Sequence, residues 1–367
     1  MKHEYYMDIA LELAKKGVGF TSPNPMVGAV IVKNDRIIGK GYHKAVGKAH
    51  AEVNAIADAG DDSKDSTLYV TLEPCNHTGR TPPCTEKIIN AGIREVVVAM
   101  EDPNPDVTGG GIKFLRSKGI KVSTGQCLKD AEMLNEAFIK HVKTKRPFVT
   151  VKCASTLDGQ IATATGDSQW VTCDKSREFV HRMRHASDGI MVGINTVVKD
   201  DPSLTTRIDG LNGSDPIRII LDTHLLISEK ARVLQISSNS DIIIISGLSV
   251  SQEKKALIEK TGAKVIESKV LVSDKKLIDL DYLMDLLGAE GITSLLIEGG
   301  GTVISSAFSA GIVDKVCFFY APKIMGGNDG VPMCSGKGAL LMKNCINVHD
   351  IKVRRFDDDV MVEGYIK

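Results

Sequence analysis

The chain has 367 residues, a length that favours two domains over a single core. Its 43% of hydrophobic and 25% of charged residues are those of an ordinary globular protein. Lys plus Arg and Asp plus Glu number 46 each, and aromatic residues make up only 5%, so we expect neither a basic field that attracts nucleic acid nor a base-stacking surface. No apolar run approaches the roughly 20 residues that span a bilayer, so we expect no membrane partner.

The first third of the chain predicts alternating helices and strands. Residues 4–16 have apolar side chains at helical spacing, and residues 26–32 and 36–42 predict a hairpin. Further helices are expected over 49–59, 85–91, 112–118 and 131–143, and further strands over 66–72, 95–99 and 121–124. This alternation predicts a sheet covered by helices. Because the N-terminal residues lack a secretory apolar core, we expect a cytoplasmic location in which the eight cysteines stay reduced.

Within this segment, His50-Ala51-Glu52 is followed by Pro74-Cys75 and then Cys84, which matches the signature of zinc deaminases apart from a longer cysteine spacing. One imidazole and two thiolates can hold zinc and leave its fourth position to water, whose pKa then falls from 15.7 towards about 7. Glu52 is expected to take a proton from that water and deliver it to a departing amine. Each residue taken alone is better explained as a surface histidine, a core cysteine or a structural zinc ligand. Their combination favours catalysis.

Other polar residues flank the expected metal site. Asn24 could contact an amide or amino edge of a pyrimidine and His43 a polar substituent, although such isolated residues are more often turn and surface positions. Cys84 lies nine residues after Cys75, and His77 and Arg80 stand in the loop between them. A long, partly basic loop over the metal suits a substrate with a phosphate-bearing tail.

The basic, proline-bearing stretch 143–147 predicts a boundary between domains 1–146 and 147–367. After it, a strand is expected over 148–152 and closes at Lys152. Further strands are expected over 189–192, 217–221, 242–245, 264–266, 294–297, 315–321 and 361–365, with helices between several of them. The second segment is therefore a separate α/β domain of about 220 residues.

One motif of the second segment indicates anion binding. Glu298-Gly299-Gly300-Gly301-Thr302 stands between the strand 294–297 and a helical run over 303–310. Backbone N–H groups at such a turn and the helix dipole favour a phosphate. The motif is neither a Walker A sequence nor G-x-G-x-x-G, so the residues alone leave phosphate and dinucleotide binding equally open.

The motif Cys75-x-His77-x-Gly79-Arg80-Thr81-Pro82-Pro83-Cys84, with His50-Ala51-Glu52 and Glu101-Asp102-Pro103-Asn104-Pro105, resembles the bifunctional riboflavin-biosynthesis deaminase–reductases along essentially the whole chain. The resemblance implies a cytidine-deaminase-like α/β/α domain that removes the 2-amino group of 2,5-diamino-6-(5-phosphoribosylamino)-4(3H)-pyrimidinone. It also implies substrate contacts from Asn24, His43, His77, Arg80, Asp102 and Asn104.

For residues 147–367 the resemblance implies a dihydrofolate-reductase-like α/β domain in which NADPH reduces the ribosyl group to a ribityl chain. The implied cofactor positions are Ala154, Trp170, Thr196, Asp200, Gly300, Gly301, Thr302, Val303, Ile304, Ser305 and Ser306. The implied substrate positions are Ser168, Arg184, Leu204, Arg207 and Glu298. Arg184 and Arg207 are expected to clamp the sugar phosphate, because a guanidinium binds phosphate through a planar fork. Lys152 is expected to act catalytically.

Three alternatives remain open at this level. Trp170 could be a half-buried core ring instead of a cofactor contact. The chain could deaminate cytosine or adenine in nucleosides or nucleic acid, or it could deaminate another pyrimidine nucleotide while its second half only binds a regulatory nucleotide. The family implies small phosphorylated pyrimidine substrates and a homo-oligomer.

Overall fold

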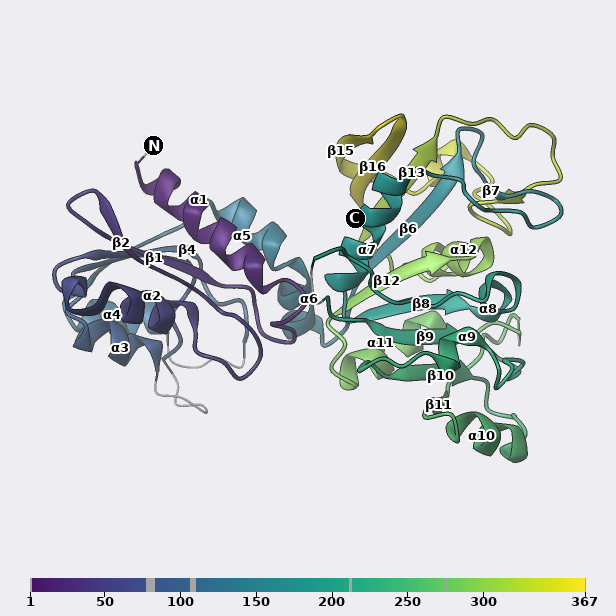
Figure 1. Cartoon of the computed structure of the whole chain (residues 1–367), viewed down its shortest axis with the longest axis horizontal. Coiled ribbons are helices and arrows are strands. Elements are labelled where there is room, and N and C mark those ends of the chain that lie inside the picture. The colour runs from purple at the N-terminus through teal and green to yellow at the C-terminus, as the bar shows by residue number, and fades with distance from the viewer. Residues whose placement is uncertain (1, 77–82, 106–109, 211–212, 275, 367) are drawn as a thin grey trace. The chain divides into compact units, whose positions relative to one another are not determined.

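The computed structural model describes residues 2–76, 83–105, 110–210, 213–274 and 276–366. The chain divides into two compact units, Met1–Lys145 and Arg146–Lys367, and each has its own hydrophobic core (Figure 1). Among the described residues, no helix combines the length and the apolarity that crossing a membrane requires.

The first unit is a sheet between two layers of helices. Its strands are β1 (Gly28–Lys33), β2 (Arg36–Tyr42), β3 (Thr67–Leu72), β4 (Glu95–Met100) and β5 (Lys121–Thr124), in the order β2-β1-β3-β4-β5. Its helices are α1 (Lys2–Ala14), α2 (Ala51–Ala59), α3 (Cys84–Asn90), α4 (Gly111–Ser117), α5 (Leu128–Leu134) and α6 (Glu136–Thr144). Figure 1 shows α1 and α5 on one face of the sheet and α2, α3 and α4 on the other. The predicted α/β/α layering is confirmed.

Two glycines of β2 allow α2 to lie directly on the sheet. A Cβ atom at Gly41 would stand 2.3 Å from the carbonyl oxygen of Ala51, and one at Gly39 would stand 2.4 Å from that of Ala55. Both distances are far inside van der Waals contact, so only glycine permits this approach of helix to strand. The close packing fixes the N-terminal end of α2, where the zinc motif begins.

The single helix predicted over 131–143 is wrong, because α5 and α6 meet at a break at Asn135. The buried Asn135 side chain accepts a hydrogen bond from the Met26 N–H at 2.8 Å and donates one to the Met26 carbonyl at 3.0 Å. A buried amide that pairs with both backbone groups of a distant residue holds that segment firmly. The break therefore anchors the loop that carries Asn24.

The second unit is built on a nine-stranded sheet with the order β11-β10-β9-β8-β12-β6-β13-β16-β15. Its strands are β6 (Phe148–Thr156), β8 (Gly189–Gly193), β9 (Ile217–Leu221), β10 (Ile242–Ser246), β11 (Lys264–Glu267), β12 (Ser294–Gly299), β13 (Lys315–Ala321), β15 (Val348–Phe356) and β16 (Asp359–Ile366). A small ribbon pairs β7 (Gln160–Ala162) with β14 (Val331–Pro332). Pairing is parallel from β11 to β13 and antiparallel at β16 and β15.

Helices cover both faces of this sheet. Successive side chains of a strand point to opposite faces, and here the side chains on both faces are buried. The helices are α7 (Asp174–His185), α8 (Ile194–Asp200), α9 (Arg232–Gln235), α10 (Gln252–Glu259), α11 (Leu280–Ala289) and α12 (Gly301–Ser309). Met191 and Ile219 belong to the cluster that also contains side chains of α11 and α12. Their neighbours Ile190 and Ile220 belong to the cluster that contains side chains of α8, α9 and α10.

Two expectations about the strands of this unit fail. β6 continues to Thr156, so the prediction that its strand closes at Lys152 is wrong and the lysine lies in mid-strand. β15 was not predicted at all, because only its terminal residues are partly buried and the polar residues between them show no alternation. The extension of β6 comes from its pairing with β13, in which Lys152 lies opposite Cys317 and Thr156 opposite Ala321.

Candidate functional site

Three potential metal ligands meet at the ends of α2, α3 and β3. His50 is the N-cap residue of α2, Cys84 is the first residue of α3, and Cys75 follows β3. Nδ1 of His50 lies 3.1 Å from Sγ of Cys84 and 3.5 Å from Sγ of Cys75, and the three ligand atoms all lie within 4.8 Å of one another. One nitrogen and two sulfurs at this spacing fit a tetrahedral zinc ion that keeps one open position.

The protonation of the three side chains also suits a cation. Hydrogen bonding with Cys84, and then with His50, lowers the pKa of the Cys75 thiol to about 4. The contact with Cys75, together with burial, raises the pKa of the Cys84 thiol, so the two sulfurs share one proton. Because a metal ion binds thiolates and neutral imidazole, it would displace that proton.

Glu52 lies in the first turn of α2, two residues after the ligand His50, and is only 3% exposed. Burial, followed by the proximity of Cys75, raises the pKa of its carboxyl group. It does not belong to the ligand cluster. A buried carboxyl with a raised pKa beside a metal position is suited to accept and return a proton.

Sequence reasoning missed the residue that fixes the Cys75 segment. Glu73 accepts hydrogen bonds from the N–H of Asp102 at 3.1 Å and from the N–H of Ile112 at 2.9 Å. It therefore ties the end of β3 to the loop after β4 and to the start of α4. Its place directly before Pro74-Cys75, at a predicted strand end, is the signal that could have identified it.

The predicted deaminase substrate residues fall into two pairs. Asn24 Nδ2 lies 3.3 Å from Nε2 of the buried His43, whose Nδ1 is 3.2 Å from the Ala49 carbonyl. Since Nδ1 must donate to that carbonyl, Nε2 accepts from the Asn24 amide, and burial lowers the pKa of His43. Asp102 accepts a hydrogen bond from the N–H of Asn104 at 2.9 Å. His77 and Arg80 lie outside the described residues.

The His43 and His50 rings pack edge to face with centroids 5.6 Å apart, so the first pair adjoins the metal ligands. A pyrimidine at the metal would therefore meet the Asn24–His43 pair. The structure brings this pair, Glu52 and the three ligands together, although they come from separate parts of the sequence.

The metal assignment predicts that each chain binds one zinc ion through these three ligands. Replacement of Cys75 or Cys84 by Ser should abolish tight zinc binding, because a neutral hydroxyl cannot replace a thiolate. Competition with a chromogenic chelator measures the affinity and the stoichiometry. Cys127→Ser is the control, since Cys127 lies outside the cluster, and an equal loss in that variant would contradict the assignment.

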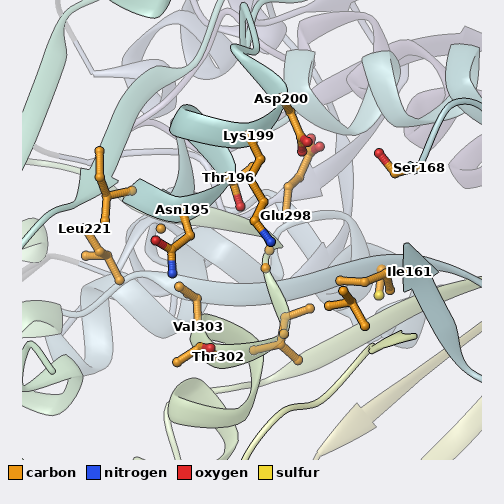
Figure 2. A pocket seen from close by; sticks show the side chains of 18 of the residues that line it. Ile161, Ser168, Asn195, Thr196, Lys199, Asp200, Leu221, Glu298, Thr302 and Val303 are labelled. Atoms are coloured by element: carbon orange, nitrogen blue, oxygen red, sulfur yellow. The ribbon is translucent and has the colours of Figure 1, made fainter. Parts of the chain in front are cut away.

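The second unit contains a cavity of about 700 Å³ above β6, β8 and β12 (Figure 2). Most of the predicted reductase residues line it, namely Lys152, Ala154, Ser168, Trp170, Arg184, Thr196, Asp200, Arg207, Glu298, Gly300, Gly301, Thr302, Val303, Ile304 and Ser306. Leu204 is instead 2% exposed within a core cluster, and Ser305 is not among the lining residues.

Arg184 and Glu298 form a nearly buried ion pair at this cavity. Nε of Arg184 lies 2.6 Å from Oε1 of Glu298, and Nη2 lies 2.8 Å from Oε2. Nη1 donates to the Thr205 carbonyl at 3.0 Å. The fork expected to clamp a phosphate is thus engaged by a carboxylate and a backbone carbonyl. Although burial alone would raise the pKa of Glu298, Arg184 and then Lys152 hold it below its usual value.

Arg207 is the exposed guanidinium at this cavity, and a residue that sequence reasoning missed supports its backbone. The N–H of Arg207 donates to Nδ1 of His181 at 3.3 Å. Burial, then Arg184 and Arg207, lowers the pKa of His181 to about 4, so the ring is neutral and carries its proton on Nε2. His181 therefore lies in the cavity wall as a neutral ring beside Arg207.

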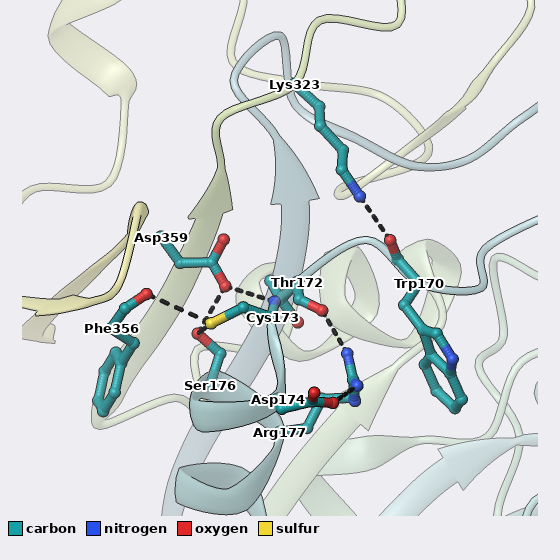
Figure 3. Close-up of polar contacts among 9 residues, drawn as sticks. All are labelled: Trp170, Thr172, Cys173, Asp174, Ser176, Arg177, Lys323, Phe356 and Asp359. Carbon is teal, nitrogen blue, oxygen red and sulfur yellow. Dashed lines mark hydrogen bonds and ion pairs between the residues drawn. The ribbon is translucent and has the colours of Figure 1, made fainter.

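Trp170 is 61% exposed, which contradicts the alternative of a half-buried core ring. The Arg177 guanidinium lies 4.5 Å from the centroid of the Trp170 ring. The backbone carbonyl of Trp170 accepts a hydrogen bond from Nζ of Lys323 at 2.6 Å (Figure 3). The segment that follows is anchored by Asp359, which accepts hydrogen bonds from the N–H of Cys173 at 2.8 Å and the hydroxyl of Ser176 at 2.7 Å. The ring is thus held at the cavity by Arg177, and its backbone by Lys323.

The glycine-rich turn forms the wall of the cavity at the start of α12. Gly300 is the N-cap residue and Gly301 the first residue of that helix, and both line the cavity. A Cβ atom at Gly301 would stand 2.6 Å from the Pro332 carbonyl oxygen, so only glycine fits beneath this loop. The N–H groups at this helix start can bind a pyrophosphate.

Comparisons with known proteins find matches for both units. Residues 1–100 match the cytidine and deoxycytidylate deaminase zinc-binding region, and residues 147–362 match the RibD C-terminal domain. The chain is 42% identical over 357 residues to the riboflavin biosynthesis protein RibD of Aquifex aeolicus, covering 97% of this chain and 96% of that protein. It is 37% identical over 371 residues to RibD of Escherichia coli, covering 98% of each.

A solved structure is similar over the same length. It is the diaminohydroxyphosphoribosylaminopyrimidine deaminase/5-amino-6-(5-phosphoribosylamino)uracil reductase of Thermotoga maritima, which has a TM-score of 0.86 and 38% identity and covers 100% of this chain and 99% of that chain.

Proposed function

Because this chain belongs to the RibD family of riboflavin biosynthesis, it is a zinc-dependent deaminase and an NADPH-dependent reductase, and we propose that residues 1–146 carry the first activity and residues 147–367 the second. The cytidine-deaminase-like and dihydrofolate-reductase-like folds predicted for the two halves are confirmed. The findings favour this function over a deaminase with a merely regulatory second half.

The two reactions follow one another on one phosphorylated pyrimidine. The deaminase removes the 2-amino group of 2,5-diamino-6-(5-phosphoribosylamino)-4(3H)-pyrimidinone, and the reductase converts the ribosyl group of 5-amino-6-(5-phosphoribosylamino)uracil to a ribityl chain. When bound, zinc activates water as a nucleophile and NADPH supplies a hydride. The observation that carries the deaminase is the cluster of His50, Cys75 and Cys84 with Glu52 in the adjoining helical turn.

In the first site we assign the proton transfers to Glu52. Its buried carboxyl group accepts a proton from the attacking water and delivers it to the amino group, which departs as ammonia. Asn24 and His43 position the pyrimidine. The hydrogen bond to His43 fixes the nitrogen of the Asn24 amide, so Oδ1 of Asn24 is the atom that accepts from the substrate's amino edge. We assign Asp102 and Asn104, with His77 and Arg80, to the rest of the substrate.

In the second site we assign the opening of the sugar ring to Lys152. Its ammonium donates a proton to the ring oxygen as the sugar opens to the imine, and Glu298 orients the ammonium through their mutual attraction. Arg207 binds the sugar phosphate, because Arg184 is already paired with Glu298. Trp170 would contact bound NADPH, and the N–H groups at the start of α12 would hold its pyrophosphate.

A coupled assay tests the whole proposal. Purified protein is incubated with the diaminopyrimidinone ribosyl phosphate with and without NADPH, while ammonia release and NADPH absorbance are followed together. Ammonia should appear in both runs, and NADPH should be consumed only after deamination. Ammonia without NADPH oxidation would remove the reductase activity from residues 147–367.

We further propose that the protein works in the cytoplasm as a homo-oligomer. Support for an interface comes from exposed apolar side chains around β15, namely Leu340, Leu341, Met342, Ile346, Ile351 and Val353. Exposed apolar side chains that gather in one segment are typical of protein–protein contacts. Light scattering on the purified protein measures the mass, and a monomer at all concentrations would contradict the proposal.

A further inference from the structure

One end of the reductase cavity is formed by the residues that follow β9. Figure 2 shows Leu221 and Asn195 at one end of the view and Ser168 at the other. Thr223, His224 and Lys276 also line the cavity. Because Glu298, Ser168 and Arg207 form the sugar-binding part, the end near Leu221 is left for the adenosine half of the dinucleotide.

The carboxylate that follows β9 is engaged by backbone N–H groups. In many dinucleotide-binding folds, an acidic residue after a strand accepts the ribose hydroxyls of NAD and disfavours a 2′-phosphate. Here Asp222 is fully buried and accepts hydrogen bonds from the N–H groups of Leu226 and Ile227, each at 2.8 Å. The same burial raises its pKa. Asp222 lines the cavity, but each of its two carboxylate oxygens is already engaged by one of these N–H groups.

A lysine from a distant part of the sequence is held beside the same strand end. The hydroxyl of Thr223 donates to the carbonyl of Lys276 at 2.7 Å, and the N–H of Lys276 donates to Asp274 at 3.0 Å. Both backbone groups of Lys276 are thus fixed. The exposed side chain lies at the cavity together with His224, the residue after Thr223.

We infer that Lys276, with His224 and Thr223, binds the 2′-phosphate of NADPH and gives this chain its preference for NADPH over NADH. This inference rests on the proposed reductase function and adds the residues that recognise the phosphate. A lysine ammonium binds phosphate as a point charge, and the hydroxyl and imidazole add hydrogen bonds. Asp222 is not available to accept the ribose hydroxyls, because both of its carboxylate oxygens accept backbone N–H groups.

Calorimetric titration of the full chain with NADPH and with NADH tests the inference without turnover. Lys276→Met should weaken NADPH binding on the order of 10- to 100-fold and leave NADH binding within about twofold, since only NADPH carries the 2′-phosphate. Lys276→Arg should retain most of the preference because it keeps the charge. The control is Lys260→Met, whose side chain is exposed beyond α10 and does not line the cavity.

The outcomes separate this inference from the proposed function. Suppose that the wild type prefers NADPH and that Lys276→Met weakens the binding of NADPH and NADH equally, or weakens neither. The inference is then overturned and the reductase function stands. If the wild type binds neither dinucleotide, the reductase function is overturned with it.

Discussion

Replacement of Glu52 by Gln should lower the rate of ammonia release by about 10²- to 10⁴-fold, which is the usual contribution of a positioned general acid–base. Gln fills the same buried space in the first turn of α2 but cannot accept or return a proton. The three metal ligands are unchanged, so the variant should still bind one zinc ion per chain. The loss should therefore appear in the chemical step and not in metal content.

Two controls isolate this effect. Glu132→Gln changes an exposed carboxylate of α5 in the same unit and should leave ammonia release unchanged. Both variants should oxidise NADPH normally when they receive the deaminated ribosylaminouracil directly, because Glu52 takes no part in the reductase. Ammonia release within tenfold of the wild type in zinc-loaded Glu52→Gln would contradict the role of Glu52.

Replacement of Arg184 by Met should destabilise the second unit by about 3–5 kcal/mol, because it leaves the Glu298 carboxylate buried without its partner. The side chains of this pair are only 13% and 8% exposed, so water cannot readily replace the guanidinium. Chemical denaturation followed by circular dichroism measures the change in unfolding free energy. Arg182→Met is the matched control on the same helix, since its pair with Glu178 is exposed and contributes about 0.5 kcal/mol or less.

A second substitution and the pH both test the cause of this loss. Glu298→Gln added to Arg184→Met should recover part of the stability, because a neutral amide needs no counter-charge. The folded wild type lowers the pKa of Glu298, so its contribution is present above the ordinary carboxyl pKa and is lost as the pH falls through the lowered value. The difference between Arg184→Met and wild type should accordingly shrink on acidification. A difference independent of pH would indicate lost packing instead.

Residues that belong to short sequence motifs were predictable from the sequence. His50, Glu52 and Cys75 stand in motifs whose spacing reflects the geometry of zinc, and the glycine-rich turn reflects a helix start near an anion. Most strands were predictable for a similar reason, since a buried strand such as β8 or β10 is a continuous apolar run. The role of Asn135 was not predictable, because its side chain forms hydrogen bonds with the backbone of Met26, which is 109 positions away in the sequence.

The sequence by itself determined which atoms are available for chemistry: a nitrogen and two thiols for zinc, a carboxyl for protons, and glycines where backbone must approach closely. Only the tertiary structure decided which of these groups are already engaged. It pairs Arg184 with Glu298, places Lys152 in mid-strand, bonds the Asp222 carboxylate to backbone N–H groups and brings Lys276 to Thr223. The physical reason is that burial and ion pairing depend on neighbours from distant strands, and these neighbours set both the charge of a group and the direction in which it can act.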